Sequence, residues 1–254
     1  MRDLQYYQPA KNLLDDRVIL VTGATSGIGR AVSHHLTQHG ARVIVHGRDP
    51  SALKRLHKEL SEIGLEPIVA KLDFENAHID EYHNLTKEIE TRFNRLDGLL
   101  HNASILGDLT PIGHYNINLW QRVMQTNLNA PFILTRYFLP LLRRSEDASI
   151  LFTTSGVGNN GRAHWGAYCA SKFATEGLAQ ILADECENTS IRVNSINPGA
   201  TRTLMRSKAF PAEDPKSLRK PESITKPYLY LLGPDSRGTS RQRFECQPTT
   251  PPLT

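Results

Sequence analysis

The sequence predicts an α/β domain with a doubly wound, mostly parallel sheet and helices on both faces. Two observations predict this fold. Short apolar runs rich in Val and Ile recur along the chain, and longer stretches with helical periodicity separate them. Because strands and helices alternate, the strands should be parallel, and burial on both faces of the sheet explains why they are apolar throughout.

The elements follow from the same patterns. Strands are predicted at 17–22, 42–45, 67–71, 97–101, 149–153 and 191–196, and the clearest helices at 31–40, 51–63 and 117–142. Residues 210–221 are polar and rich in proline, and we expect a mobile flap over the substrate at about 204–224. Residues 247–254 are expected to be a loose tail.

Composition is that of one globular domain spanning 1–254. Of its residues 39% are hydrophobic and 22% charged, and the net charge of +4 includes no long basic block, so no nucleic-acid partner is expected. Cys169, Cys186 and Cys246 form no Cys-x-x-Cys pair, which argues against a disulfide framework and a metal site. No apolar run is long enough for a membrane span. We therefore expect a soluble, cytoplasmic protein.

The first predicted strand leads into a glycine-rich turn, Thr22-Gly-Ala-Thr-Ser-Gly-Ile-Gly29, and then into a helix. Such a turn lets backbone N–H groups and the helix dipole meet a pyrophosphate. A glycine-rich turn that binds nothing is the alternative, but the position at the first strand–helix junction favours a dinucleotide and a Rossmann-type fold. The expected contacts come from the whole turn: Gly23, Thr25, Ser26, Gly27, Ile28 and Gly29.

The end of the second strand bears on which dinucleotide binds. Gly47 occupies the place where an NAD enzyme would carry a carboxylate for the ribose, and Arg48 follows it. A guanidinium suits the 2′-phosphate, so NADP(H) is favoured over NAD(H), although Arg48 as a solvated loop charge is the alternative. Asp49, before Pro50, is predicted to cap the next helix.

Tyr168 and Lys172 are four residues apart in a stretch predicted to be helical, so their side chains leave the same face. A fixed ammonium beside a phenol favours phenolate, and we expect it to move the pKa of Tyr168 downward toward a value useful for proton transfer. The spacing alone is common by chance.

Together with the glycine turn, Asn102-Ala103, Asn127, Ser155, Tyr168-x-x-x-Lys172 and Pro198-Gly199 make the sequence resemble the short-chain dehydrogenase/reductase family over residues 14–200. Further segments, among them Ser171-Lys-Phe-Ala-Thr-Glu-Gly177, resemble its bacterial YciK-type branch. Two departures stand out: His101 and Ser104 replace the asparagine and glycine that flank Asn102-Ala103 in the family. Histidine at a strand end is predicted to be a hydrogen-bonded core residue, without a chemical role.

The resemblance implies a carbonyl–alcohol oxidoreductase. Tyr168 would be the general acid or base, Lys172 would lower its pKa and hold the ribose, Ser155 would bond the substrate oxygen, and Asn127 would hold a water beside the lysine. The remaining cofactor contacts implied are Asp73 at the adenine, Asn102 and Ala103 beneath the cofactor, and Pro198, Gly199, Thr201 and Thr203 at the nicotinamide. Each polar residue could instead serve a cap or a turn.

The expected partners are a small carbonyl or alcohol substrate and, by the same resemblance, further copies of the chain in a homodimer or homotetramer. Two other functions compete. A nucleotide sensor would keep the glycines without needing the acid, and a Rossmann-type methyltransferase would make the Tyr–Lys spacing accidental. We also expect Arg202, Arg206 and Lys208 to be solvated charges rather than groups that recognise an acidic substrate.

Overall fold

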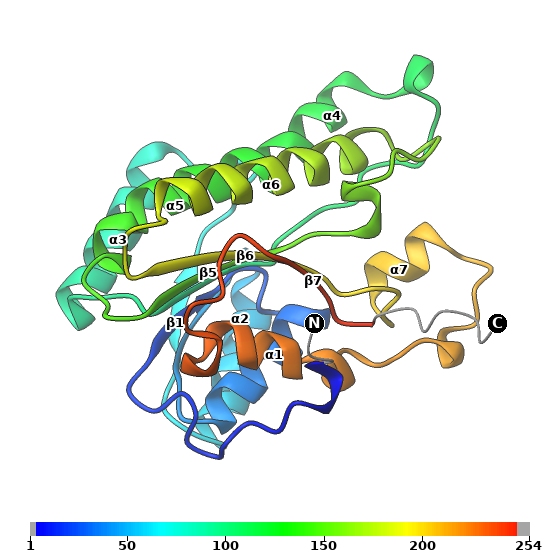
Figure 1. Ribbon diagram of the computed structural model, residues 1–254. Coiled ribbons are helices and arrows are strands. Elements are labelled where there is room, and N and C mark those ends of the chain that lie inside the picture. Colours follow the sequence, from blue (N-terminus) through cyan, green and yellow to red (C-terminus); the bar gives the residue numbers. More distant parts are fainter. Residues whose placement is uncertain (1–3, 248–254) are drawn as a thin grey trace.

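The computed structural model describes residues 4–247 and confirms the predicted fold class (Figure 1). One sheet has the order β3-β2-β1-β4-β5-β6-β7, and every neighbouring pair is parallel. The strands are β1 (Val18–Val21), β2 (Arg42–Gly47), β3 (Ile68–Lys71), β4 (Gly98–His101), β5 (Ala148–Thr153), β6 (Ile191–Asn197) and β7 (Arg243–Glu245). The order reverses between β1 and β4, and ligands bind at such a switch point.

Helices cover both faces of the sheet in separate layers (Figure 1). One layer contains α3 (Ile79–Phe93), α4 (Ile117–Met124), α5 (Ala130–Leu142) and α6 (Gly166–Glu185), and the other contains α1 (Gly27–Gln38), α2 (Pro50–Ser61) and α8 (Lys226–Leu232). Two apolar clusters form the core. Tyr82 and Phe138 lie in the cluster under α3, α5 and α6, and Leu36 and Tyr228 in the cluster under α1, α2 and α8.

The stretch predicted as one helix over 117–142 contains a change of pitch. Between α4 and α5, Gln125–Asn129 forms a π-helical turn, and the Ala130 N–H bonds to the Gln125 carbonyl. Pro131 follows, and proline has no N–H to bond the Asn127 carbonyl four residues earlier. Wide turns of this kind are frequent at functional sites.

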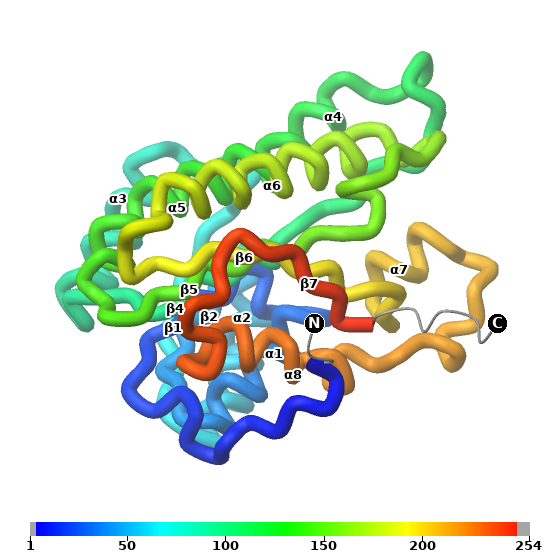
Figure 2. The backbone as a smooth tube through the Cα atoms, viewed as in Figure 1, coloured from blue at the N-terminus to red at the C-terminus, as the bar shows by residue number. Residues whose placement is uncertain are grey.

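The C-terminal part of the described chain returns to the sheet. β7 pairs with β6, and the sequence patterns did not predict it. Figure 2 shows α8 on the layer of α1, with the N-terminal segment running beside it. The predicted flap contains α7 (Leu204–Ala209) and two short 3-10 turns, Pro215–Ser217 and Pro221–Ile224. Residues 248–254 of the predicted tail lie outside the described residues.

No helix in residues 4–247 is both long enough and apolar enough to cross a membrane.

Candidate active site

The carboxyl ends of the strands open onto a cavity of about 1050 Å³. It collects residues predicted from distant parts of the sequence: Gly23, Ser26, Gly27, Ile28, Asn102, Ala103, Ser155, Tyr168, Lys172, Pro198, Gly199, Thr201 and Thr203. Five other predicted residues lie outside its lining: Thr25, Gly29, Arg48, Asp73 and Asn127. The cavity also takes in residues of the predicted flap, so the flap forms one of its walls.

The glycine turn at the end of β1 is held in a conformation that side chains would prevent. Gly23 has φ +63°, and a Cβ there would lie 2.8 Å from the Ala103 Cα. A Cβ at Gly29 would lie 2.3 Å from the Gly23 carbonyl oxygen, so α1 packs directly against the turn. Ser26 precedes α1 and its side chain makes no capping bond, which leaves the first N–H groups of the helix available. These features fit a pyrophosphate.

Thr22 joins this turn to β4, and it was not among the predicted site residues. Its Oγ1 accepts the N–H groups of Asn102 (2.9 Å) and Ala103 (3.0 Å) and donates to the Leu100 carbonyl (3.1 Å). Asn102 returns a bond from Nδ2 to the Thr22 carbonyl (3.2 Å). The switch point is therefore fixed by a hydroxyl at the end of β1 and an amide at the end of β4.

His46, near the end of β2, supports the same turn from the other side. Its Nδ1 accepts the Gly23 N–H at 3.3 Å, so the proton is on Nε2, which donates to the Leu72 carbonyl at 3.0 Å. Burial lowers the pKa of His46 to about 4, with the Leu72 carbonyl opposing. The ring therefore stays neutral near pH 7, as this pair of bonds requires.

Tyr168 and Lys172 lie on α6 and are both buried. Tyr168 forms a hydrogen bond with Ser155, while Lys172 Nζ lies 5.6 Å from the centre of the Tyr168 ring and donates to the Thr153 carbonyl at 2.8 Å. Burial raises the pKa of Tyr168 to about 12, against the lowering effect of the Ser155 bond. The expected downward shift is therefore wrong for this structure, because loss of water around the phenol outweighs the lowering effect of Ser155.

Lys172 is itself affected by the low polarity of its surroundings. Burial lowers its pKa to about 8, while the carboxylate of Glu176, one turn along α6, raises it. Glu176 is held in place because it accepts bonds from Ser195 Oγ (2.7 Å) and Arg243 Nε (2.9 Å). Arg243 belongs to β7, so the C-terminal strand stabilises the counter-charge of the lysine.

Asn127 sits in the π-helical turn with a fully engaged side chain. Its Oδ1 accepts the Ile105 N–H (2.8 Å), and its Nδ2 donates to the Ile105 carbonyl (2.9 Å) and to Ser171 Oγ (3.0 Å). The amide thus clamps the loop after β4 onto α6. Its carbonyl accepts a bond from Thr175 Oγ1 at 3.3 Å, and Pro131 has no N–H with which to bond it.

The groups at the ends of β2 and β3 gather beside the glycine turn. Arg48 is exposed and ion-paired with Glu75 at 3.8 Å, and Glu75 also pairs with Arg122 at 2.5 Å. Gly47 has no room for a carboxylate, because a Cβ there would lie 2.8 Å from Thr25 Cγ2.

The two aspartates of this region have local bonds. Asp49 caps α2 as predicted, accepting the N–H of Ser51 at 2.8 Å. Asp73 accepts the Glu75 N–H at 3.2 Å and Asn76 Nδ2 at 2.8 Å. The Asp73 carboxylate therefore orders the turn after β3.

The segment after β6 is tied down by a residue that sequence reasoning placed in the tail. Gln247 Nε2 donates to the carbonyls of Pro198 (2.8 Å) and Ala200 (3.0 Å). Thr203 Oγ1 accepts the Arg206 N–H at 3.1 Å, so it caps α7. No local pattern could have indicated Gln247, because its partners lie almost fifty residues away.

A stack of aromatic rings and guanidinium groups lines the cavity where the flap meets the start of α6. The Trp165 ring is 5.9 Å from the Tyr168 ring and 5.6 Å from the Phe210 ring. Arg162 lies over both Trp165 (5.5 Å) and Phe210 (5.3 Å), and Arg206 lies 3.7 Å from the centre of Phe210. Cation–π contacts therefore hold the flap against the wall that carries Tyr168.

A parallel, doubly wound sheet with a glycine turn at its switch point has the Rossmann-type architecture, and a buried Tyr–Lys pair beside that turn narrows the class. The sequence pattern of the family described as short chain dehydrogenase matches residues 17–214. The chain belongs to this family and, with it, to the oxidoreductases.

Several relatives resemble it over nearly their whole length. The chain is 48% identical over 248 residues to the uncharacterized oxidoreductase YciK of Escherichia coli K12, covering 97% of this chain and 98% of the relative. A short chain dehydrogenase from Shigella flexneri 2a, solved as a complex with NADP, is 48% identical, with a TM-score of 0.92 over 94% of this chain and 100% of that one. Another from E. coli CFT073, complexed with NADPH, is 47% identical with the same TM-score and coverage. The expected likeness to the YciK-type branch is confirmed.

Proposed function

We propose that the protein is an NADP(H)-dependent oxidoreductase that interconverts a carbonyl compound and its alcohol, with Tyr168 as the general acid or base. The observation that carries this proposal is that Ser155, Tyr168 and Lys172 line the same cavity as the glycine turn, with Tyr168 and Lys172 both buried. When bound there, the nicotinamide cofactor supplies or accepts the hydride. The protein's own residues position the carbonyl and handle the proton.

In the direction of reduction, Tyr168 donates its proton to the carbonyl oxygen while Ser155 Oγ–H stabilises the charge that develops on that oxygen. A pKa raised to about 12 keeps the phenol protonated at neutral pH, which is the form that an acid needs. Lys172 holds its charge below pH 8 and stabilises the phenolate left behind. The Asn127 carbonyl accepts one bond from Thr175 Oγ1, and its second lone pair is suited to bind the water that returns a proton.

The cofactor is expected to lie along the carboxyl edge of the sheet. The N–H groups at the start of α1 would hold the pyrophosphate, Asp73 would contact the adenine end, and the segment 198–203 would contact the nicotinamide end. NADP(H) is favoured over NAD(H) because Arg48 supplies a cation for the 2′-phosphate. The complexes of the Shigella and E. coli relatives with NADP and NADPH support this preference.

The test is a screen of ketones, aldehydes and alcohols with NADPH or NADP, followed by Tyr168→Phe. We expect this change to lower kcat by about two to four orders of magnitude, the scale of a lost general acid, while the Kd of NADPH changes little. Tyr82→Phe is the matched control, because the buried Tyr82 hydroxyl has no hydrogen-bond partner in the described part of the chain. NADPH binding with no turnover of any compound in either direction would instead favour a nucleotide sensor.

We also propose that the chain forms a homodimer or homotetramer through the layer of α5 and α6. Phe132 on α5 and Phe173 and Ile181 on α6 are exposed by 50%, 43% and 59%, and such side chains are often covered by a second copy. Light scattering should give a mass of two or four chains, and Phe173→Asp should lower it. A wild-type mass of one chain at micromolar concentration would refute this assembly.

A further inference from the structure

The cations that line the cavity differ in whether the protein already neutralises them. Arg30 pairs with Glu59 at 2.6 Å, and Arg206 Nε pairs with Glu213 at 2.6 Å. Arg202 donates to two backbone carbonyls of the flap, and Lys172 donates to Thr153. These groups have partners within the fold. They are therefore poor candidates for binding a free anion.

Arg162 differs from these residues. It is exposed, lines the cavity, and within residues 4–247 its guanidinium contacts only the rings of Trp165 and Phe210. A guanidinium stacked on aromatic faces keeps its N–H edge free for a planar anion, and the stacking restricts its motion before a ligand arrives. Lys220 also lines the cavity, but it begins the 3-10 turn that packs against α1, on the side of the cofactor phosphates.

The position of Arg162 relative to Tyr168 limits the shape of a ligand that could reach both. The Trp165 ring adjoins both of them: its centre is 5.5 Å from the Arg162 guanidinium and 5.9 Å from the centre of the Tyr168 ring. An anion on Arg162 and a carbonyl beside Tyr168 would therefore both lie next to the Trp165 ring. A ligand that reaches both groups would carry its carboxylate and its carbonyl on a spacer that lies against this ring.

We propose that the substrate is an anionic carbonyl compound whose carboxylate binds Arg162 and is separated from the reacting carbonyl by a short chain lying along Trp165. This inference rests on the proposed function, and it names the class of substrate for the same site. A charge-assisted, bidentate bond at the mouth of the cavity orients the chain, and the aromatic surface of Trp165 favours an apolar spacer. Arg202 and Arg206, which were expected to be solvated charges, are instead bonded within the fold, so Arg162 is the group left to recognise the anion.

The experiment compares oxo acids of increasing chain length with their methyl esters, using NADPH oxidation as the readout. Wild-type kcat/KM should be highest for an acid with an intermediate spacer and should exceed that of its ester by about ten- to a hundredfold, the scale of one charge-assisted bond. Arg162→Gln should remove most of this acid-to-ester ratio, and Arg162→Lys should retain part of it. Arg55→Gln, which removes an exposed arginine on α2, should leave the ratio unchanged.

A second measurement does not depend on turnover. Isothermal titration calorimetry on Tyr168→Phe protein loaded with NADPH should show tighter binding of the preferred acid than of its ester, and adding Arg162→Gln should abolish the difference. If the wild-type enzyme has the same kcat/KM for the acid and its ester, and the acid binds no more tightly than the ester, the inference is wrong. An equal loss for acid and ester in Arg162→Gln would show that Arg162 only fastens the flap through Phe210. Failure of all turnover with the binding difference intact would refute the proposed reaction and leave the anion site standing.

Discussion

At the scale of single residues, the end of β2 shows how a missing side chain and a charged one act together. Gly47 leaves room for Thr25, and the next residue, Arg48, extends into solvent with 63% of its side chain exposed. Glu75 restrains Arg48 at 3.8 Å and is itself held by Arg122. The long ion pair at an exposed site costs little to break, so Arg48 can turn toward a phosphate.

Arg48→Ala should therefore raise the KM for NADPH by about ten- to a hundredfold, the scale of one charge-assisted contact, with little change in the KM for NADH. The measurement is the ratio of kcat/KM for the two cofactors with a substrate from the screen. Arg55→Ala, on the exposed face of α2, serves as the charge control. Equal weakening toward NADH and NADPH would mean that Arg48 does not recognise the 2′-phosphate.

Residue roles were predictable from the sequence where they depend on near neighbours. The cap at Asp49 needs only the next few residues, and its bond to Ser51 is confirmed. The contacts of Thr22 and Gln247 were not predictable, because their partners lie about eighty and fifty residues away. The pKa of Tyr168 was predicted in the wrong direction because spacing indicates a neighbouring charge but not the depth of burial.

At the scale of elements, the six predicted strands are confirmed because buried parallel strands must be apolar at every position. β7 was missed because it has three residues, of which Arg243 and Glu245 are charged. The periodicity of 117–142 is helical, and a single wide turn within it leaves no apolar signature. Its only trace in the sequence is Pro131, just beyond the turn.

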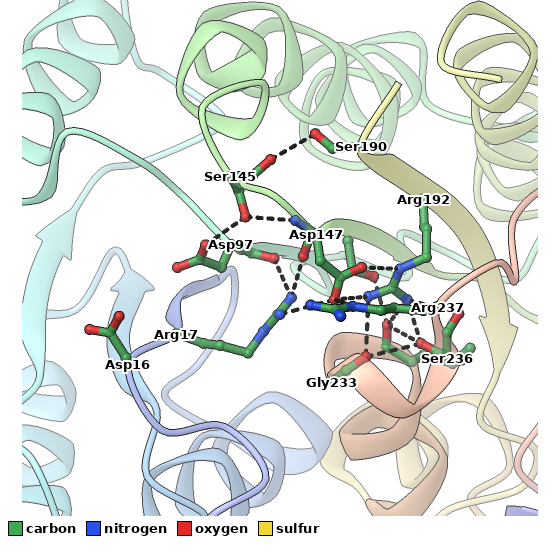
Figure 3. A network of polar contacts seen from close by, with 12 residues as sticks. Asp16, Arg17, Asp97, Ser145, Asp147, Ser190, Arg192, Gly233, Ser236 and Arg237 are labelled. Atoms are coloured by element: carbon green, nitrogen blue, oxygen red, sulfur yellow. Dashed lines mark hydrogen bonds and ion pairs between the residues drawn. The ribbon is translucent and has the colours of Figure 1, made fainter. Parts of the chain in front are cut away.

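The opposite edge of the sheet contains a buried ionic network that joins several strands (Figure 3). Asp147, just before β5, accepts bonds from Arg17 at 3.1 Å and Arg192 at 2.9 Å, and Arg237 lies 3.5 Å away. The side chains of Asp147 and Arg192 are each 7% exposed. Removing one partner of a buried pair leaves the other charge without compensation.

Asp147→Asn should therefore lower the free energy of unfolding by about 3–5 kcal/mol, measured by urea denaturation. Asp184→Asn is the matched control. Its partner is Arg241, both side chains are about 60% exposed, and its loss should cost less than about 1 kcal/mol. Folded Asp147→Asn protein should bind NADPH normally, because the network lies at the edge of the sheet away from the cavity. If Asp147→Asn and Asp184→Asn unfolded at the same urea concentration, this account would be contradicted.

At the scale of the whole molecule, the functional site and the stabilising ionic network lie at opposite edges of the sheet. Its carboxyl edge presents backbone donors, a phenol and a cavity, whereas its amino edge is closed by ion pairs. Two neutral histidines lie at the carboxyl ends of β2 and β4. His46 and His101 are both buried, and His101 bonds Thr135 Oγ1 at 2.8 Å and stacks on Phe152 at 4.6 Å. The predicted core role of His101 agrees with this environment.

These histidines should make the fold sensitive to moderate acid. Burial lowers the pKa of His46 to about 4 and that of His101 to about 3, while both return to about 6.5 in the unfolded chain. The unfolded state therefore binds more protons below pH 6.5, so the stability present above that pH falls as the pH drops toward 4. Between pH 7.5 and pH 5 each histidine should lower the free energy of unfolding by about 2 kcal/mol.

Urea unfolding at the two pH values should show this loss, and His101→Asn should reduce it by about half, whereas His57→Asn on α2 should follow the wild-type curve. An unchanged pH dependence in His101→Asn would mean that this ring does not control the acid sensitivity of the fold.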